Sequence, residues 1–473
     1  MGPITPPSDF PVLDRIPKDQ SSLATLPPFT VSLPNGFLPL SPPPTTLPAA
    51  FERLETLLVQ MSIRTQERRP GLLATFTLGE SVIKNLPDLT DEIDQFKYDL
   101  RIMGALFRDY SFVASAYLLE PCHEKNLKGE GYGLGRQRLP AVLARPLAKV
   151  AEISGFKPFM EYAGSYALFN YRLEDPTRGM EYANLRLIRA FEHGLDPSSS
   201  EAGFVLVHVD MVKHSGRLVQ GAVKTLLACG EADRVFFDAG LDLVVQAMTD
   251  VNAVMDNMWK KSKPSDYGSF RTFIFGITNQ FMFPHGVVYE GVSEEPLSFR
   301  GESGANDSMI PLCDNLLEIK MPETPLTDIL QDFRSYRPGN HREFLEWVKD
   351  RAECVGIEEY AMKDRESAVQ RSTETWEKAL YLRALNQVRD FRWRHWCFTR
   401  EYILKKTAHP TASGGSPIVV WLPSQLFSVY EQMLEVEGVY GKLPGCEDFM
   451  DLVRSQKVTL KKEVDRYCRE RGV

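Results

Sequence analysis

Apolar residues recur every three or four positions over most of the chain, which is the spacing of an amphipathic helix. The pattern predicts helices over residues 49–61, 91–118, 141–155, 203–230, 232–261, 269–282, 311–320, 340–353, about 366–406, and from 418 to the C-terminal end. Residues 120–140, with Pro121 and four glycines, are expected to form a long connection. Two-residue alternation typical of strands is scarce, so the sequence predicts a mainly α fold.

Proline content and a weakening of the helical pattern divide the chain. Thirteen of the 32 prolines lie in the first 50 residues, a density that suits neither a helix nor a central strand. This segment still carries Phe29, Phe37 and Leu38, more apolar content than a free tail usually has. We expect residues 1–48 to form an extended arm packed on the body, followed by a small α domain (49–185) and a large α domain (186–473).

Composition narrows the class of protein. With 473 residues, 43% hydrophobic and 25% charged, the chain has enough apolar material for a sizeable core. The net charge of −8, without a basic block, makes a nucleic-acid partner unexpected, and no apolar stretch is long enough to cross a membrane. The seven cysteines are odd in number and form no CxxC pair, and the N-terminus does not resemble a signal peptide. We therefore expect a cytoplasmic protein.

One histidine interrupts an apolar helix face. The residues on this face follow steps of three and four along the long helix: Tyr381, Leu385, Val388, Phe391, His395, Phe398 and Tyr402. A buried imidazole needs a hydrogen bond or a metal. His395 is either a hydrogen-bonded core residue or the axial ligand of a haem, since a porphyrin supplies the other four nitrogens.

A second histidine, His208, lies in the apolar run FVLVHVDMV. It is either a hydrogen-bonded core residue or the second polar side of a pocket. His341 begins a helix after a Pro-Gly turn, and we assign it a structural role. The glycines from Gly129 to Gly135 never form GxGxxG, and no GxSxG occurs, so neither a dinucleotide site nor a serine hydrolase is indicated. Cys397 lies two positions from His395, on another face of the helix.

Taken together, several blocks resemble the indoleamine 2,3-dioxygenase family, haem enzymes that open the indole ring of tryptophan. The blocks are NGFLP, LPAVLARPLAKVAEISGFKPFMEYA, GFVLVH, GVVYEGV, FRGESGANDSMIPLCDNLLEI, DFRSYRPGNHREFL, RWRHWCFTREYI and SGGS. The resemblance covers nearly the whole chain. It implies a two-domain, mainly α fold whose large domain binds haem b.

The resemblance also implies roles for individual residues. His395 falls on the proximal iron ligand, and His208 and Ser303 fall on the catalytic face. The cofactor-binding set is His395, Arg392 near the haem propionates, Asp314 supporting that side, and Ser303 and Gly304 in the loop over the haem edge. The substrate-binding set is Tyr162, Ser165, Phe204, His208, Phe270, Arg271 and Phe275, with Ser413, Gly414 and Gly415 in a mobile loop.

Two positions depart from the family's pattern. The family usually has a serine where this chain has His208, and a histidine there is typical of the related tryptophan 2,3-dioxygenases. The arginine that clamps the substrate carboxylate aligns with Phe275, while Arg271 lies one helical turn earlier. A guanidinium–carboxylate contact is strong and geometry-specific. An indole whose carboxylate is absent or masked is therefore expected to bind better than free tryptophan.

The implied activity is cleavage of the indole C2–C3 bond with O2 by ferrous haem, which yields an N-formylkynurenine-type product. The implied partners are O2, an indole-containing small molecule and an electron donor that keeps the iron ferrous. Two alternatives stay open. One is a haem monooxygenase or rearrangement enzyme that acts on a modified indole in specialised metabolism. The other is a non-catalytic haem-binding sensor.

Overall fold

The computed structural model describes residues 12–321, 325–363, 371–406 and 411–472. Its α-helices are α1 (Gln20–Thr25), α2 (Glu52–Met61), α3 (Leu72–Thr75), α4 (Leu78–Asn85), α5 (Leu100–Leu127), α6 (Ala141–Ser154), α7 (Ser200–Val212), α8 (Ser215–Gly230), α9 (Arg234–Met255), α10 (Met258–Lys261), α11 (Tyr267–Arg271), α12 (Met309–Leu316), α13 (Pro325–Arg334), α14 (Gly339–Val355), α15 (Ile357–Met362), α16 (Arg371–Phe398), α17 (Ile418–Tyr440) and α18 (Glu447–Arg471). The predicted mainly α class is confirmed.

Short elements connect these helices. The strands are β1 (Arg138–Leu139), β2 (Tyr171–Leu173), β3 (Leu185–Leu187) and β4 (Val288–Tyr289). β1 pairs with β4 in parallel, and β2 pairs with β3 in antiparallel register. Five 3-10 turns cover Ala49–Phe51, Glu92–Gln95, Tyr182–Asn184, Thr272–Ile274 and Gly304–Asn306, and π-helical turns cover Tyr162–Tyr166 and Thr399–Leu404, all counted over the described residues.

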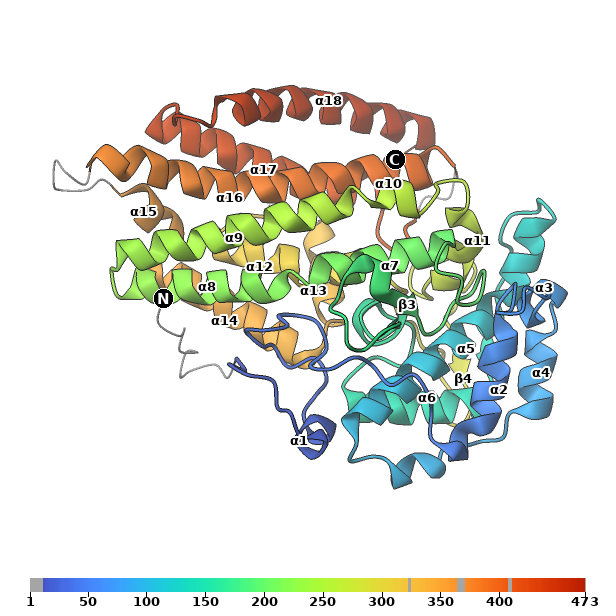
Figure 1. Ribbon diagram of the computed structural model, residues 1–473. Helices are drawn as coiled ribbons and strands as arrows, with labels where there is room; N and C mark the ends of the chain where they lie inside the picture. Colours follow the sequence, from blue (N-terminus) through green and yellow to red (C-terminus); the bar gives the residue numbers. More distant parts are fainter. Residues whose placement is uncertain (1–11, 322–324, 364–370, 407–410, 473) are drawn as a thin grey trace.

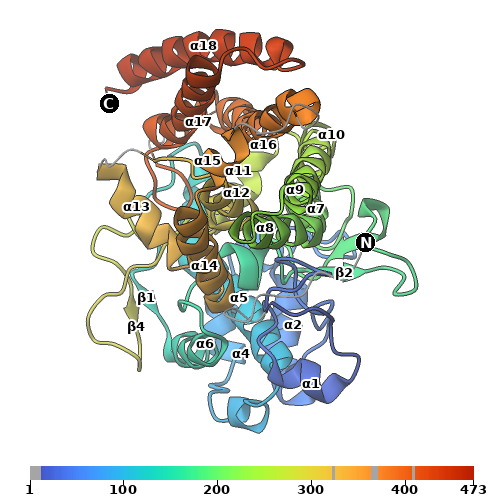
Figure 2. The same cartoon turned by 90° about the vertical axis from the view of Figure 1, so that its left-hand side faces the viewer.

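The helices gather in two groups along the chain. Those from α1 to α6 lie at one end of the molecule, along the bottom and the right of Figure 1, and those from α7 onward make up the larger part. Figure 2 shows the same separation, with α18 at one end and α1, α2 and α4 at the other. Within the larger group, α9 packs against α7, α8 and α16, and α17 packs against α16 and α18. The division at residue 185 stays a prediction.

The proline-rich segment from residue 12 onward lies along the body. Phe29 and Phe37 are buried, and both rings contact the imidazole of His341 edge-on. The backbone N–H of Phe37 donates to the Ser215 hydroxyl, and that of Val31 donates to the Asn340 side chain. His341 is therefore a packing residue between the arm and α14. No helix in the described part of the chain has the length and apolar character needed to cross a membrane.

The expected connection over 120–140 is partly wrong, because α5 continues to Leu127 with Pro121 inside it. A proline inside a helix lacks the N–H that would bond the carbonyl four residues earlier, here that of Tyr117. The Arg136 guanidinium donates to this carbonyl and also pairs with buried Glu120 at 2.6 Å. A side chain far along the sequence thus satisfies the group that Pro121 leaves open, and the helix continues.

The helix expected over 269–282 is shorter than predicted. The structure has α11, the 3-10 turn Thr272–Ile274, and then extended backbone from Phe275. At the next residue, Gly276, a Cβ would lie 2.0 Å from the backbone nitrogen of Gly301. The close approach of these two backbones ends the helix.

Asp109 on α5 lies at the centre of a buried ion-pair network. Its carboxylate accepts hydrogen bonds from the guanidinium groups of Arg108 and Arg189 at 2.7 to 3.2 Å. Arg189 also pairs with Glu55 on α2, and Arg108 donates to the carbonyl of Pro44 in the arm. The network therefore joins α2, α5, the arm and the segment after β3. Burial alone would raise the pKa of Asp109, but the two guanidinium groups outweigh it and lower the pKa to about 2.

We predict that Asp109→Asn lowers the free energy of unfolding by about 3 kcal/mol or more, because it leaves two buried guanidinium groups without their shared anion. Urea denaturation measures this. Because the folded pKa of Asp109 is depressed, its contribution is complete above about pH 4 and declines as pH falls towards 2. The matched control is Glu290→Gln, which removes an exposed pair with Arg138 and should cost under about 1 kcal/mol. Equal losses in the two variants would contradict the prediction.

Candidate active site

Two adjoining cavities lie where α7, α12, α16 and α17 meet the loop around residue 303. The smaller, about 170 Å³, has walls of Tyr162, Phe204, Tyr267, Phe391, Phe398, Tyr402 and Trp421, and we call it the aromatic cavity. The larger, about 420 Å³, is lined by several arginines, and we call it the basic cavity. Residues that line both are Gly304, Ala305, Asp307, Phe391, His395, Trp421 and Leu422.

His208 faces the aromatic cavity from α7. Its Nδ1–H donates to the carbonyl oxygen of Phe204 at 2.8 Å, which fixes the tautomer and leaves Nε2 as an acceptor. A Cβ at Gly304 would lie 3.8 Å from this Nε2, so the free nitrogen faces the loop over the cavity. Burial lowers the pKa of His208, with the Phe204 carbonyl opposing. His208 is therefore neutral at neutral pH.

His395 lines both cavities from the last turn of α16. Among the described residues its imidazole makes no hydrogen bond, and its ring contacts that of Phe391. Burial, then His208 and Arg392, lower the pKa of His395 to about 4. The helix continues as the π-helical turn Thr399–Leu404, which keeps Tyr402 on the cavity wall.

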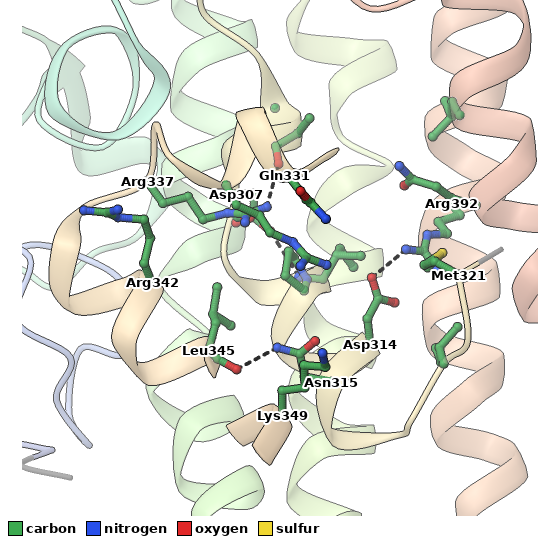
Figure 3. Close-up of a pocket in the computed structure, with 18 of the residues that line it drawn as sticks. Asp307, Asp314, Asn315, Met321, Gln331, Arg337, Arg342, Leu345, Lys349 and Arg392 are labelled. Carbon is green, nitrogen blue, oxygen red and sulfur yellow. Dashed lines mark hydrogen bonds and ion pairs between the residues drawn. The ribbon is translucent and has the colours of Figure 1, made fainter. Parts of the chain in front are cut away.

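The basic cavity is built to hold negative charge. Arg392 pairs with Asp314 at 2.7 Å, yet its Nε and Nη1 atoms are buried without a partner among the described residues. Figure 3 shows this pair on one side of the cavity and Arg337 and Arg342 on the other. Arg337 donates to the carbonyl oxygens of Asp307 and Ala305, which holds it against the loop. Arg334 and Lys349 also line this cavity.

The Gly-rich loop, residues 411–416, is docked on the aromatic cavity. The Ser413 hydroxyl donates to the backbone carbonyl of Glu302 at 3.0 Å, and the N–H of Gly276 donates to the carbonyl of Ser413 at 2.9 Å. Arg300 donates to the carbonyl of Gly414 at 3.0 Å. Gly415 has φ +84°, a left-handed conformation that favours glycine. The loop therefore closes over the segment that contains Ser303.

The structure brings together some of the residues that the sequence singled out. Those that line one or both cavities are Tyr162, Phe204, His208, Ser303, Gly304, Asp314, Arg392, His395 and Ser413. Those that do not line them are Ser165, Phe270, Arg271, Phe275, Gly414 and Gly415. The Ser165 hydroxyl bonds the backbone of Glu161, and Phe270 packs behind Phe204 with ring centroids 5.8 Å apart. The functional roles of both groups stay predictions.

Arg271 lies behind the cavity wall. It is 2% exposed, its guanidinium lies 4.7 Å from the ring centroid of Phe275, and Nη2 donates to the carbonyl of Thr411 at 3.2 Å. It holds the start of the Gly-rich loop instead of lining the cavity. Its Nε is buried without a partner among the described residues, but Arg271 is not one of the residues that line the aromatic cavity.

Sequence reasoning missed several cavity residues, among them Glu302, Asp307, Tyr267, Arg337 and Trp421. Glu302 and Asp307 are acids in the small-residue loop FRGESGANDS, which the resemblance assigned to the haem edge. Two acids in a loop of small residues could have marked both as candidate site residues. The sequence does not reveal that both are buried. Burial raises the pKa of Glu302 to about 8 and that of Asp307 to about 6.

Comparison with known proteins gives the family. The family model described as indoleamine 2,3-dioxygenase matches residues 25–428. The chain belongs to this family. The resemblance read from the sequence blocks is confirmed, and membership supports an oxidoreductase of the dioxygenase type with tryptophan and indole chemistry.

Three relatives illustrate the similarity. Indoleamine 2,3-dioxygenase 1 of Rattus norvegicus is 26% identical over 331 residues, which cover 69% of this chain and 73% of that protein. Indoleamine 2,3-dioxygenase of Saccharomyces cerevisiae is 26% identical over 353 residues, covering 71% and 72%. Indoleamine 2,3-dioxygenase 2 of Homo sapiens is 28% identical over 218 residues, so this match spans 46% of the chain and about half, 52%, of the human protein.

The residues present fit a haem. The described part of the chain brings together no group of three or more metal-ligating side chains, but haem iron needs only one axial imidazole. The imidazole of His395 is half-buried on the cavity wall, neutral, and without a hydrogen bond among the described residues, which suits a ligand nitrogen. The unpartnered Arg392 N–H groups in the basic cavity suit the propionates.

We predict that Gly414→Ala loosens the Gly-rich loop. A Cβ there would lie 2.8 Å from the Phe333 ring and 3.0 Å from the Cβ of Ser303, and overpacking of this kind costs about 1–3 kcal/mol. Amide hydrogen exchange at Gly276, whose N–H bonds this loop, should accelerate about tenfold. Gly438→Ala is the control, because a Cβ there meets no described atom within 4 Å. Unchanged exchange in Gly414→Ala would contradict the docked loop.

Proposed function

We propose that the protein is a haem-dependent dioxygenase that opens the C2–C3 bond of an indole to an N-formylkynurenine-type product. The observation that carries the proposal is the pair of neutral imidazoles, His208 and His395, on a cavity with aromatic walls. The adjoining basic cavity and the family relationship support it. The proposed partners are O2, an indole and an electron donor.

His395 would hold the iron of haem b, and Arg392 and Arg337 would pair with the propionates. Bound in this way, ferrous haem supplies the binding and activation of O2. The Asp314 carboxylate holds the Arg392 guanidinium at 2.7 Å. Arg392 would therefore pair with Asp314 and with a haem propionate at the same time. The cofactor and its ligand set are part of the proposal.

His208 is proposed to orient the indole. Its Nδ1–H is already engaged by the Phe204 carbonyl, so Nε2 is free to accept the indole N–H. The rings of Tyr162 and Phe204 lie 5.9 and 5.0 Å from the imidazole, centroid to centroid, and restrict its movement. A fixed acceptor beside aromatic walls would present one edge of the indole in a defined orientation.

The Gly-rich loop is proposed to exclude water. In the docked state Ser413 closes on the carbonyl of Glu302, and Gly414 packs against Phe333. A dry cavity strengthens the hydrogen bond to His208 and limits side reactions. Opening of the loop would release the product.

Free tryptophan is not the substrate that this cavity favours. Arg271 lies behind the wall, where its Nη2 donates to the Thr411 carbonyl, and Phe275 has no hydrogen-bond donor on its side chain. The loss of a charged hydrogen bond to the carboxylate costs about 1.5–3 kcal/mol, which lowers the affinity for free tryptophan roughly tenfold to a hundredfold. An indole with an absent or masked carboxylate is proposed instead.

We predict that His395→Ala loses the haem. The other described imidazole on this cavity, His208, lies on α7 and is held in place by its Nδ1–H bond to the Phe204 carbonyl, so it does not replace His395. The protein is purified with haem added during expression, and the ratio of Soret to protein absorbance is measured. His341→Ala is the control, since this buried histidine packs against Phe29 and Phe37 outside both cavities. Full haem retention in His395→Ala with an unchanged Soret band would overturn the ligand assignment.

The activity is tested by product mass. Reduced, haem-loaded protein is incubated with O2 and, in turn, L-tryptophan, its amide and tryptamine. The proposal predicts a product heavier than its substrate by two oxygen atoms, formed faster from the amide and tryptamine than from L-tryptophan. Addition of one oxygen atom would instead favour the monooxygenase alternative, and unaltered substrates would favour the sensor.

A further inference from the structure

Glu302 is a buried acid without a structural partner. It is 3% exposed and lines the aromatic cavity together with Tyr162, His208 and His395. Its backbone carbonyl accepts the Ser413 hydroxyl, but in the described part of the chain its carboxyl group takes part in no hydrogen bond or ion pair. A buried acid without a partner is costly, so its presence on a ligand cavity indicates a role outside the fold.

The two neighbouring acids differ from Glu302 in this respect. The Glu161 carboxylate accepts the backbone N–H groups of Ala163 and Gly164 and so caps the π-helical turn Tyr162–Tyr166. Asp307 accepts two backbone N–H groups at the start of α12, at 2.9 and 3.2 Å. Both carboxylates hold local backbone in place. Glu302 is the acid of the three whose carboxyl group has no such task.

The surroundings of Glu302 are negative or neutral. The described titratable groups that interact with it or line the same cavity are Glu161, Tyr162, Tyr166, Tyr267, Tyr402, Asp307, His208 and His395. Burial, then the charge of Glu161, raise the pKa of Glu302 to about 8. Among the described residues no lysine or arginine offsets this shift. An incoming cation would both ionise the carboxyl group and pair with it.

We propose that Glu302 binds a protonated amine on the substrate and thereby selects indoles with a cationic side chain and no free carboxylate. This inference rests on the proposed function and assigns the substrate class of the same cavity. The basic cavity holds the anions of the cofactor, and Glu302 provides the negative charge for the substrate at the other cavity. A zwitterionic ligand would bring its carboxylate into a cavity that Glu302 and Asp307 line, where no lysine or arginine among the described residues would pair with it.

The test compares tryptamine with 3-ethylindole, a near-isosteric indole without the amine. In the native holoenzyme we expect kcat/KM to be at least tenfold higher for tryptamine. Glu302→Gln keeps the shape and removes the charge, so it should lose most of that factor on tryptamine and stay within about twofold on 3-ethylindole. Glu295→Gln, an exposed acid on the same segment, is the matched control and should change neither substrate.

The pH dependence gives a second readout. Calorimetry should find that tryptamine binds more tightly to the native protein as pH rises from 6 to 8, because the Glu302 carboxyl group must lose its proton while the amine stays charged. In Glu302→Gln this slope should flatten. Retention of the native slope in the variant would assign the titration to another group and overturn the proposal.

The outcomes separate this inference from the proposed function. Equal loss on both indoles in Glu302→Gln, or no loss on either, overturns the amine site even when the indole ring is opened. Tryptamine binding that depends on Glu302, without ring opening by the loaded native protein, overturns the proposed function and supports the amine site. Since 3-ethylindole is measured in the same variant, it also reports whether the cavity is intact.

Discussion

Two imidazoles on the wall of one cavity impose the main constraint on this structure. His208 on α7 and His395 on α16 face one cavity, and burial holds both neutral. The Nε2 atom of His208 and the imidazole of His395 have no hydrogen-bond partner among the described residues, so a ligand must satisfy them. The surrounding helices keep the cavity between the two side chains open. α9 packs against both α7 and α16 and fixes their separation. The close approach of α7 to α10, where a Cβ at Gly203 would lie 1.9 Å from a backbone oxygen, sets the position of His208 along its axis.

Charge is divided between the two cavities. The basic cavity carries Arg392, Arg337 and their neighbours, and the aromatic cavity carries Glu302 close to Glu161 and Asp307. The Gly-rich loop ties the acidic side to the body, since Ser413 bonds the Glu302 backbone and Arg300 bonds the Gly414 carbonyl. An anionic cofactor and a cationic substrate would therefore bind at opposite ends of one continuous site.

Much of the helical architecture follows from periodicity in the sequence. The stripe that contains His395 is buried at Tyr381, Leu385, Val388, Phe398 and Tyr402, because steps of three and four residues keep one face of the helix on the core. It is half-buried at Phe391 and His395, where it lines the cavities. Periodicity did not reveal that α5 continues through Pro121. That outcome depends on Arg136, whose guanidinium bonds the carbonyl that Pro121 leaves open, and such a contact is not visible in local sequence.

The candidate site was predictable where function depends on residue type and motif. His395, His208 and Arg392 were found in this way. Glu302 was not, and Arg271 was predicted to bind substrate but lies behind the cavity wall. Both outcomes depend on which side of that wall the side chain lies. Arg271 points to the loop backbone, and Glu302 reaches the cavity. Sequence gives the charge of a side chain, whereas tertiary packing decides what that charge meets.

A crystal structure of the ferrous, haem-loaded protein tests the central claim most directly. The account predicts one haem between the two helices, with iron bonded to His395, propionates against Arg392 and Arg337, and His208 on the opposite face without a bond to iron. Iron bonded to His208, iron bonded to both imidazoles, or haem outside the two cavities would contradict it.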